Sequence, residues 1–475
     1  MAVIKRIASN TVIQVIGKLV VALVGILTLA LILSGFGESG QGKYILAIAY
    51  AQFIASIADF GLGIYLVRLF SQTKKVSAES QQAIPLRLVS AGIFYGLGAI
   101  AVYAFPYDLE TSQAIWLALL ASLFISINAV LVAYYQSRLK MQIPVGAEVV
   151  NRLIVLGLVF LIINFNFPFL NILWAVVIGG AVNLFISWLL LGSDFAITLR
   201  PKISVWRRIV SQSLPIWITA ILGLIYFRID TILLSILPMP AGRENLVELA
   251  SYGTAYKFLE ILIAIPGMFL GVVMPLFVRA EKDSGRLTEI FKKAFYAISF
   301  FAAPVAIGSF MVAQPLMDLF FPELGEAAVA LKILIWAFVF SSLASSFIYL
   351  VLGLGKQKFL IWPYIAIAVV NVSLNIILIP QLGFRGAAYA TILSEFLLFA
   401  FGFIIIRRLK LIQGFYSYQA LATWLAAGLM GLSLAWLPEE LVVRFLAGVV
   451  TYLAFAWLLG GLDVVTFKKL IKREE

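Results

Sequence analysis

The fold is decided by the stretch TVIQVIGKLVVALVGILTLALIL, residues 11–33, in which Lys18 is the only charged side chain. At ~1.5 Å of rise per residue, a helix of this length crosses the ~30 Å hydrocarbon core of a bilayer. Lys5 and Arg6 precede the stretch as they would in a signal peptide, but no convincing small-residue cleavage site follows. We therefore expect a retained first membrane span.

The rest of the chain has the same character. Of its 475 residues, 63% are hydrophobic and 12% are charged, with a mean hydropathy of +1.05, whereas a soluble domain has roughly 25% charged residues. The sequence holds no cysteine and no histidine, which excludes disulfides, thiolate or imidazole metal sites, and nucleophiles activated by histidine. The net charge of +12 comes from basic residues at the ends of apolar segments, so we expect no nucleic-acid partner.

Apolar segments long enough to cross a bilayer recur about fourteen times. The connections between them are short, so no soluble catalytic domain fits between spans. These features predict an all-α integral membrane protein with about fourteen transmembrane helices. The predicted spans are 11–33, 44–69, 86–105, 113–136, 146–163, 171–192, 209–237, 250–278, 294–318, 328–353, 359–379, 387–406, 417–437 and 441–460.

The distribution of lysine and arginine predicts the orientation. The segments on the N-terminal side of the membrane, Arg87 among them, hold 26 basic residues, and the opposite loops hold 4. By the positive-inside bias, we expect both termini to be cytoplasmic. The four basic residues of the opposite loops are Lys43, Arg243, Arg385 and Arg444.

A weak internal repeat predicts two halves. KMQIPVGAEVVN (140–151) and KFLIWPYIAIAVVN (358–371) both lead from a lysine through a proline to Val-Val-Asn, and their asparagines lie 220 positions apart. Tyr44 and Tyr252, which open inward-going spans, lie 208 apart. Repeated halves are common in transporters; the alternative is chance likeness among apolar helices. The predicted domains are a six-helix lobe at 1–200, a second at 201–410, an extra hairpin at 411–460 and a basic cytoplasmic tail at 461–475 that lies on the lipid surface.

Two glycine patterns have structural interpretations. GFGESG, residues 35–40, matches a dinucleotide-binding pattern but lies between two spans without any βαβ unit, so we interpret it as an outer turn. Gly92 and Gly96 in the third span predict close helix packing within the bundle.

Charged residues inside the spans are the most informative positions. Each costs ~2.5 to 3.5 kcal/mol on an isolated membrane helix, so the set must face one another or water. Lys18 and Asp59 have similar predicted depths and are a candidate ion pair within the bundle, whereas Arg228 and Asp230 lie ~200° apart on one helix and cannot neutralise each other along one face. For the whole set we favour a polar central cavity. Its members are Lys18, Asp59, Arg152, Arg228, Asp230, Lys257, Glu260, Lys332 and Glu395.

The sequence resembles the polysaccharide-transporter branch of the multidrug, oligosaccharidyl-lipid and polysaccharide exporter superfamily, which includes the Wzx-like flippases. The likeness covers nearly the whole chain, and the order and spacing of its pieces are more specific than any single piece. They are NTVIQVIGK (10–18), ADFGLGIYLVR (58–68), FRIDTILL (227–234), YGTAYKFLEILIAIPGMFLGVVMPLF (252–277) and NVSLNIILIPQLGFRGAAYATILSE (371–395).

The resemblance implies two six-helix lobes around a V-shaped cavity, with the last two helices outside. It also implies a flippase that moves polyprenyl-diphosphate-linked oligosaccharide, such as an O-antigen or polysaccharide repeat unit, from the cytoplasmic to the outer leaflet by alternating access. Under this hypothesis the basic residues bind the diphosphate and glycan, and the acidic residues serve as counter-charges or ion-coupling sites. The diphosphate candidates are Lys18, Arg152, Arg228, Lys257 and Lys332, and the acidic set is Asp59, Asp230, Glu260 and Glu395.

Other functions remain open at this stage. A cation-coupled multidrug exporter and a peptidoglycan-precursor flippase belong to the same superfamily, and a membrane glycan polymerase or ligase would act on the same lipid. We expect no enzymatic activity, because the loops carry no recognisable catalytic site. We expect no cofactor and no bound metal. We expect the protein to be a monomer, with membrane lipids and other glycan-assembly membrane proteins as partners. We expect transport to be driven by Na⁺, H⁺ or the membrane potential.

Overall fold

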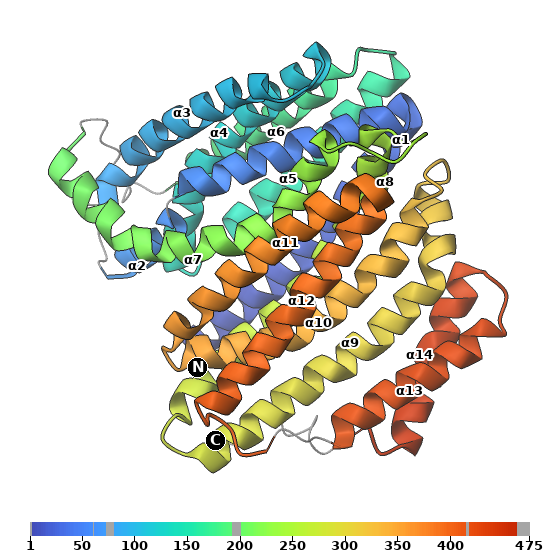
Figure 1. Ribbon diagram of the computed structural model, residues 1–475. Coiled ribbons are helices and arrows are strands. Elements are labelled where there is room, and N and C mark those ends of the chain that lie inside the picture. Colours follow the sequence, from blue (N-terminus) through green and yellow to red (C-terminus); the bar gives the residue numbers. More distant parts are fainter. Residues whose placement is uncertain (1, 60, 73–79, 192–200, 415–417, 463–475) are drawn as a thin grey trace. The chain divides into compact units, whose positions relative to one another are not determined.

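The computed structural model describes most of the chain and is entirely helical over that part (Figure 1). Its two compact units are residues 1–238 with 244–250, and residues 239–243 with 251–475. The backbone is described for residues 2–59, 61–72, 80–191, 201–414 and 418–462, and the side chains for those residues except 2–12, 64, 68, 72, 80, 214–216 and 218–227. The predicted tail at 461–475 therefore lies almost wholly outside the described residues.

The first unit contains seven α-helices among its described residues. Within it, α4 packs against α1, α2, α3 and α6, and α5 packs between α1 and α6. α7 packs against α1 and α2. The helices are α1 (Ala2–Asp59), α2 (Leu62–Gln72), α3 (Ala83–Ala101), α4 (Leu109–Ser137), α5 (Gln142–Asn164), α6 (Leu170–Leu189) and α7 (Ile203–Ile236).

The second unit takes up the chain after the first turns of α8. Its centre is α10, which packs against α9 and α12, while α11 packs against α12. The predicted C-terminal hairpin is formed by α13 and α14, which lie side by side and pack on α9 (Figure 1). The helices are α8 (Asn245–Arg279), α9 (Ser284–Phe320), α10 (Ala327–Gly353), α11 (Ile361–Leu382), α12 (Phe384–Arg408), α13 (Tyr418–Ala435) and α14 (Leu441–Leu458).

These helices confirm the predicted class of all-α, multi-pass integral membrane protein. Twelve helices in the described part of the chain are long and apolar enough to cross a membrane. One of the twelve, the segment Ile13–Asp59 of α1, contains the predicted span 11–33 and most of the span 44–69. α7, whose side chains are described only in part, covers the predicted span 209–237. The six-helix lobes and their boundaries stay a prediction.

A single residue joins the first two spans. Gly37 has φ 68° and ψ −174°, a conformation that side chains disfavour, and helix resumes directly on either side of it. Across this kink the Gln41 Nε2 donates to the Leu29 carbonyl over 3.3 Å. In a straight helix these two residues would lie ~18 Å apart, so the chain turns back sharply here. The predicted turn at 35–40 is thus reduced to one glycine.

The second predicted span is interrupted rather than continuous. α1 ends at Asp59 and α2 begins at Leu62, with Gly61 at φ 69° between them. The left-handed conformation of Gly61 stops the α1 helix, because it cannot continue the regular hydrogen-bond pattern. The predicted span 44–69 is therefore divided between α1 and α2.

The repeat asparagines occupy equivalent interfaces. Asn151 of α5 packs against α6 at Gly179, where a side chain would collide with the Asn151 amide oxygen. Asn371 of α11 donates to the Ser394 hydroxyl of α12 over 2.9 Å. Both asparagines are buried. Each of them therefore faces the helix that follows its own.

Gly92 and Gly96 do not mediate helix packing. Both lie exposed on α3, and an added Cβ would meet nothing within 4 Å at either position. The close approach on α3 occurs at Gly98, where a Cβ would lie 3.0 Å from the Ile54 side chain of α1. The predicted packing motif was assigned to the wrong face of the helix.

Three of the basic residues predicted in the outer loops have acidic partners. Lys43 contacts Asp108 at 3.0 Å and Glu110 at 2.5 Å, joining α1 to the start of α4. Arg385 contacts Glu326 at 2.9 Å, joining α12 to the start of α10. Arg444 lies 3.5 Å from Glu439, but it is buried in the first turn of α14 rather than in a loop. Local pairing thus balances much of the charge at these helix ends.

Candidate functional site: a polar and an apolar pocket

A polar pocket lies inside the first unit. It is a cavity of about 120 Å³ with room for a few water molecules or one small polar group. Lys18 of α1 and Glu148 of α5 contribute opposite charges to its wall, and Asn128 of α4 and Asn183 of α6 contribute amides. Lys18 is one of the predicted site residues, and its role there stays a prediction, whereas Glu148 was not among them.

The amides of the polar pocket are ordered by each other. Asn128 Nδ2 donates to Asn183 Oδ1 over 3.2 Å. This leaves Asn128 Oδ1 buried without a hydrogen-bond donor. The pocket therefore offers an ammonium donor, a carboxylate and a neutral acceptor, a combination that suits hydroxyl groups or ordered water.

Asp59 is paired, but not with Lys18. The Arg87 guanidinium of α3 donates to the Asp59 carboxylate, to the Ser126 carbonyl at 3.0 Å and to the Ala58 carbonyl at 3.3 Å. Arg87 is 3% exposed. The suggested pair of Lys18 with Asp59 was therefore wrong. Arg87 holds the broken end of α1 against α3 and α4.

Arg152, Arg228 and Asp230 occupy different helices and environments of the first unit. Arg152 of α5 is half-buried, its Nε has no acceptor, and it lies within electrostatic range of Tyr44 of α1. On α7, Asp230 is buried and its Oδ1 accepts a hydrogen bond from the Thr231 amide at 2.7 Å, while Arg228 is half-buried. The different burial of Arg228 and Asp230 fits their predicted ~200° separation around the helix.

The remaining four predicted charges belong to the second unit. Lys257 and Glu260 contact each other at 3.1 Å along one face of α8. Lys332 is half-buried on α10. Glu395 of α12 is fully buried near Ser341 of α10, and its Oε2 has no hydrogen-bond donor. The structure thus brings Lys257 and Glu260 together and places Lys332 and Glu395 on neighbouring helices.

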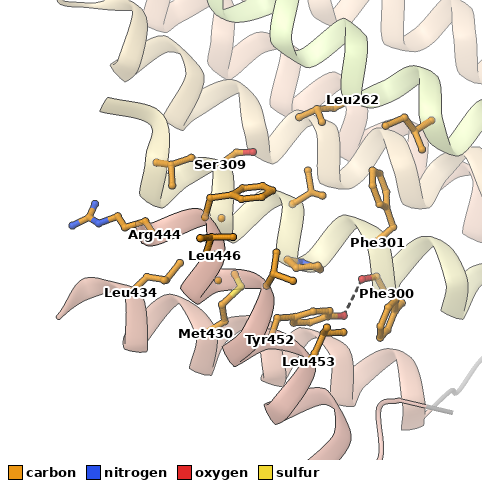
Figure 2. Close-up of a pocket in the computed structure, with 18 of the residues that line it drawn as sticks. Leu262, Phe300, Phe301, Ser309, Met430, Leu434, Arg444, Leu446, Tyr452 and Leu453 are labelled. Carbon is orange, nitrogen blue, oxygen red and sulfur yellow. Dashed lines mark hydrogen bonds between the residues drawn. The ribbon is translucent and has the colours of Figure 1, made fainter. Parts of the chain in front are cut away.

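An apolar pocket of about 1020 Å³ lies within the second unit, between α8, α9, α13 and α14 (Figure 2). Phenylalanine, leucine, isoleucine, valine and proline side chains dominate its wall. The polar side chains among the described lining residues are Ser309, Arg444 and Tyr452. Figure 2 shows the Arg444 guanidinium directed away from the cluster of apolar side chains.

The apolar pocket reaches the surface of the second unit. Val442 and Phe445 of α14 line it and are also 68% and 62% exposed. Sequence reasoning missed this pocket, because a side chain that faces lipid and one that lines an apolar groove follow the same helical period. Prolines clustered in the predicted spans 250–278 and 294–318 were the available signal of irregular packing.

The comparisons with known proteins give this helical membrane fold a family. Residues 7–281 match the family described as "Polysaccharide biosynthesis protein", and the chain belongs to that family. Family membership agrees with the polysaccharide branch of the resemblance found in the sequence, and the fold is like that of solved MurJ and MATE structures.

Solved structures with a similar fold include lipid-precursor and drug transporters. "Lipid II flippase MurJ, inward closed conformation" has a TM-score of 0.78 and 14% identity, covering 96% of this chain and 99% of that one. The inward-facing conformation of a "multidrug resistance MATE family transporter of the MOP superfamily" has a TM-score of 0.68 and 18% identity, covering 83% and 99%. An outward-facing conformation of a multidrug resistance MATE family transporter has a TM-score of 0.58 and 19% identity, covering 86% and 95%. No curated protein sequence matches the chain.

Proposed function

We propose that the protein flips a polyprenyl-diphosphate-linked oligosaccharide from the cytoplasmic to the outer leaflet of a prokaryotic inner membrane by alternating access. Membership of a polysaccharide biosynthesis family supports a glycan-containing substrate. The observation that carries the proposal within the structure is the apolar pocket of about 1020 Å³ in the second unit. Its size and lining suit a long hydrocarbon chain that enters from the bilayer.

The charged residues of the spans suit the head group. A diphosphate crossing hydrocarbon needs cations, and glycans need hydrogen-bonding groups. Lys18 is the strongest candidate, because it lines the polar pocket together with Asn128 and Glu148. The other candidates for the diphosphate are Arg152, Arg228, Lys257 and Lys332, and the candidates for counter-charge or ion coupling are Asp59, Asp230, Glu260 and Glu395.

Transport of an anionic head group out of a negatively charged cytoplasm has an available driving force. One charge that moves through 100 mV gains ~2.3 kcal/mol. Membrane potential alone can therefore drive a dianionic substrate outward, and Na⁺ or H⁺ exchange through the buried acids is the other route.

A flipping assay in proteoliposomes tests the proposal. A fluorescent polyprenyl-diphosphate oligosaccharide is incorporated, and a membrane-impermeant reductant bleaches only the label in the outer leaflet. Protein-dependent bleaching of the inner pool is expected, and Lys18→Gln should slow it while Lys140→Gln, at an exposed turn residue, should not. The proposal is wrong if the inner pool stays protected although the protein is folded.

The same vesicles separate the competing functions. Export of an organic cation without lipid flipping would indicate a multidrug exporter. Faster flipping of a lipid-linked peptidoglycan precursor than of the oligosaccharide would indicate a precursor flippase. Any transfer of sugar between lipids would indicate an enzyme and refute the transport proposal.

A further inference from the structure

Helix α9 contains two carbonyls that its own backbone cannot satisfy. Pro304 and Pro315 lie inside the helix, and a proline has no N–H to donate to the carbonyl four residues earlier. The carbonyls affected are those of Phe300 and Met311. In a membrane an unpaired carbonyl costs several kcal/mol unless a neighbouring group donates to it.

Helix α14 donates to both of them. Tyr452 Oη donates to the Phe300 carbonyl over 2.8 Å, as Figure 2 shows. Arg444 Nη1 donates to the Met311 carbonyl, also over 2.8 Å. The two prolines of α9 and the two donors of α14 are therefore matched one to one.

The match fixes the direction and register of α14. Phe300 and Met311 are eleven residues apart, which places their carbonyls ~16 Å apart on nearly the same face of α9. Arg444 and Tyr452 are eight residues apart, or ~12 Å along α14. The long arginine side chain spans the remaining distance. Since the later donor reaches the earlier carbonyl, the two helices run antiparallel.

Apart from a small apolar cluster that α14 shares with α9 and α13, few contacts bury this helix. Its buried residues recur at every fourth position, and two of the four are Gly448 and Ala456, which contribute little apolar area. Most of its large apolar side chains are exposed, Val450 at 67% and Trp457 at 69% among them. The other two buried residues are the donors Arg444 and Tyr452. Hydrogen bonding therefore has an unusually large share in docking this helix.

Arg444 also orders the turn of the hairpin. Its Nε donates to the Pro438 carbonyl over 3.0 Å and its Nη2 to the Leu437 carbonyl over 3.1 Å. One guanidinium thus connects α9, the end of α13 and the start of α14. These contacts use the fork of donors that distinguishes arginine from lysine.

We propose that Arg444 and Tyr452 are positioning residues that latch the α13–α14 hairpin onto α9 through the carbonyls vacated by Pro315 and Pro304. α9 and α14 are also walls of the apolar pocket. The latch therefore sets the opening of that pocket, whichever lipid occupies it. Loss of the latch leaves the hairpin folded but variable in its distance from α9.

A double-mutant cycle tests the role of the vacated carbonyls. Tyr452→Phe should lower the folded-to-unfolded ratio about tenfold, because it leaves the Phe300 carbonyl without a donor. In a Pro304→Ala background the restored N–H serves that carbonyl, and the same change should have little effect. The matched control is Thr451→Val, whose hydroxyl bonds to the Ala447 carbonyl within α14; its effect should be equal in both backgrounds. An equal loss for Tyr452→Phe in both backgrounds would overturn the proposal.

A distance measurement tests the positioning role independently of stability. The chain has no native cysteine, so spin labels can be attached at Leu319→Cys and Val450→Cys, positions 62% and 67% exposed on α9 and α14. A single narrow distance distribution is expected. Combining Arg444→Met with Tyr452→Phe should broaden it, and restoring either residue should narrow it again. A distribution that stays narrow in the doubly substituted protein would refute the latch.

Discussion

Replacing Arg87 by methionine should strongly destabilise the first unit. The residue lies near a helix end, where replacing a basic side chain usually has little effect on stability. Methionine keeps an unbranched, apolar side chain of similar reach and removes every donor. The substitution leaves the Asp59 carboxylate and the carbonyls of Ala58 and Ser126 without the guanidinium that now serves all three. Removing one partner of a buried ion pair costs about 3 to 5 kcal/mol. Because the Asp59 side chain is 34% exposed and can be hydrated in part, we expect the lower end, about 3 kcal/mol.

Denaturant titration of the purified protein in bicelles measures this loss. Lys140→Met, which removes a cation from an exposed turn, is the control and should change the unfolding free energy by less than about 0.5 kcal/mol. Combining Arg87→Met with Asp59→Asn should recover part of the loss, because the unpaired charge is gone. If Arg87→Met behaves like the Lys140 control, then Arg87 does not hold the end of α1 against α3 and α4.

Three further predictions concern other parts of the chain. Gly386→Ala should abolish folding of the α11–α12 pair, since the new Cβ would lie 2.5 Å from the Leu378 carbonyl oxygen; folded yield should fall sharply, whereas Gly92→Ala, at an open position, should fold normally. Burial alone raises the pKa of Asp108, but hydrogen bonds from Thr111 and Lys43 outweigh it and hold the pKa below its usual value. The stabilisation from Asp108 is therefore present above the unfolded-state pKa and is lost as the pH falls through the lower folded-state value; thermal melts from about pH 6 to pH 3 should show this loss, and Asp108→Asn should show less of it. Lys257→Gln should change the unfolding free energy by no more than about 0.5 kcal/mol, because its contact with Glu260 is a partly exposed pair on one helix; a larger loss of stability would mean that Lys257 has a buried structural role.

The sequence was sufficient for the all-helical class and for the approximate place of most helices, because each span must satisfy its own backbone inside a bilayer. It also singled out Lys18, which lines the polar pocket and whose role stays a prediction. It could not identify the partner of Asp59. Depth along a helix follows from residue number, but the direction in which a side chain points toward a neighbouring helix depends on packing. Lys18 and Arg87 were both available at suitable depth, and packing selected Arg87.

The two buried arginines show a second limit of sequence reasoning. Arg87 and Arg444 each lie within five residues of a helix start, where counting loop charges assigns them to the aqueous side. Both instead donate to main-chain carbonyls. For Arg444 a signal did exist: Pro315 implies an unpaired carbonyl at Met311, and a long donor on a neighbouring helix is one of the few groups that can satisfy it.

Gly37 has a consequence for the orientation of the chain in the membrane. The apolar segment that contains it is 47 residues long, and as a straight helix it would measure ~70 Å, more than twice the thickness of the hydrocarbon core. The reversal at Gly37 lets this one segment cross the core twice, in opposite directions. A side chain at position 37 would disfavour the left-handed backbone that makes the reversal. A segment that crossed only once would put every later connection on the side opposite to the one its basic residues favour, so this glycine keeps the first two spans consistent with the charge pattern of the rest of the chain.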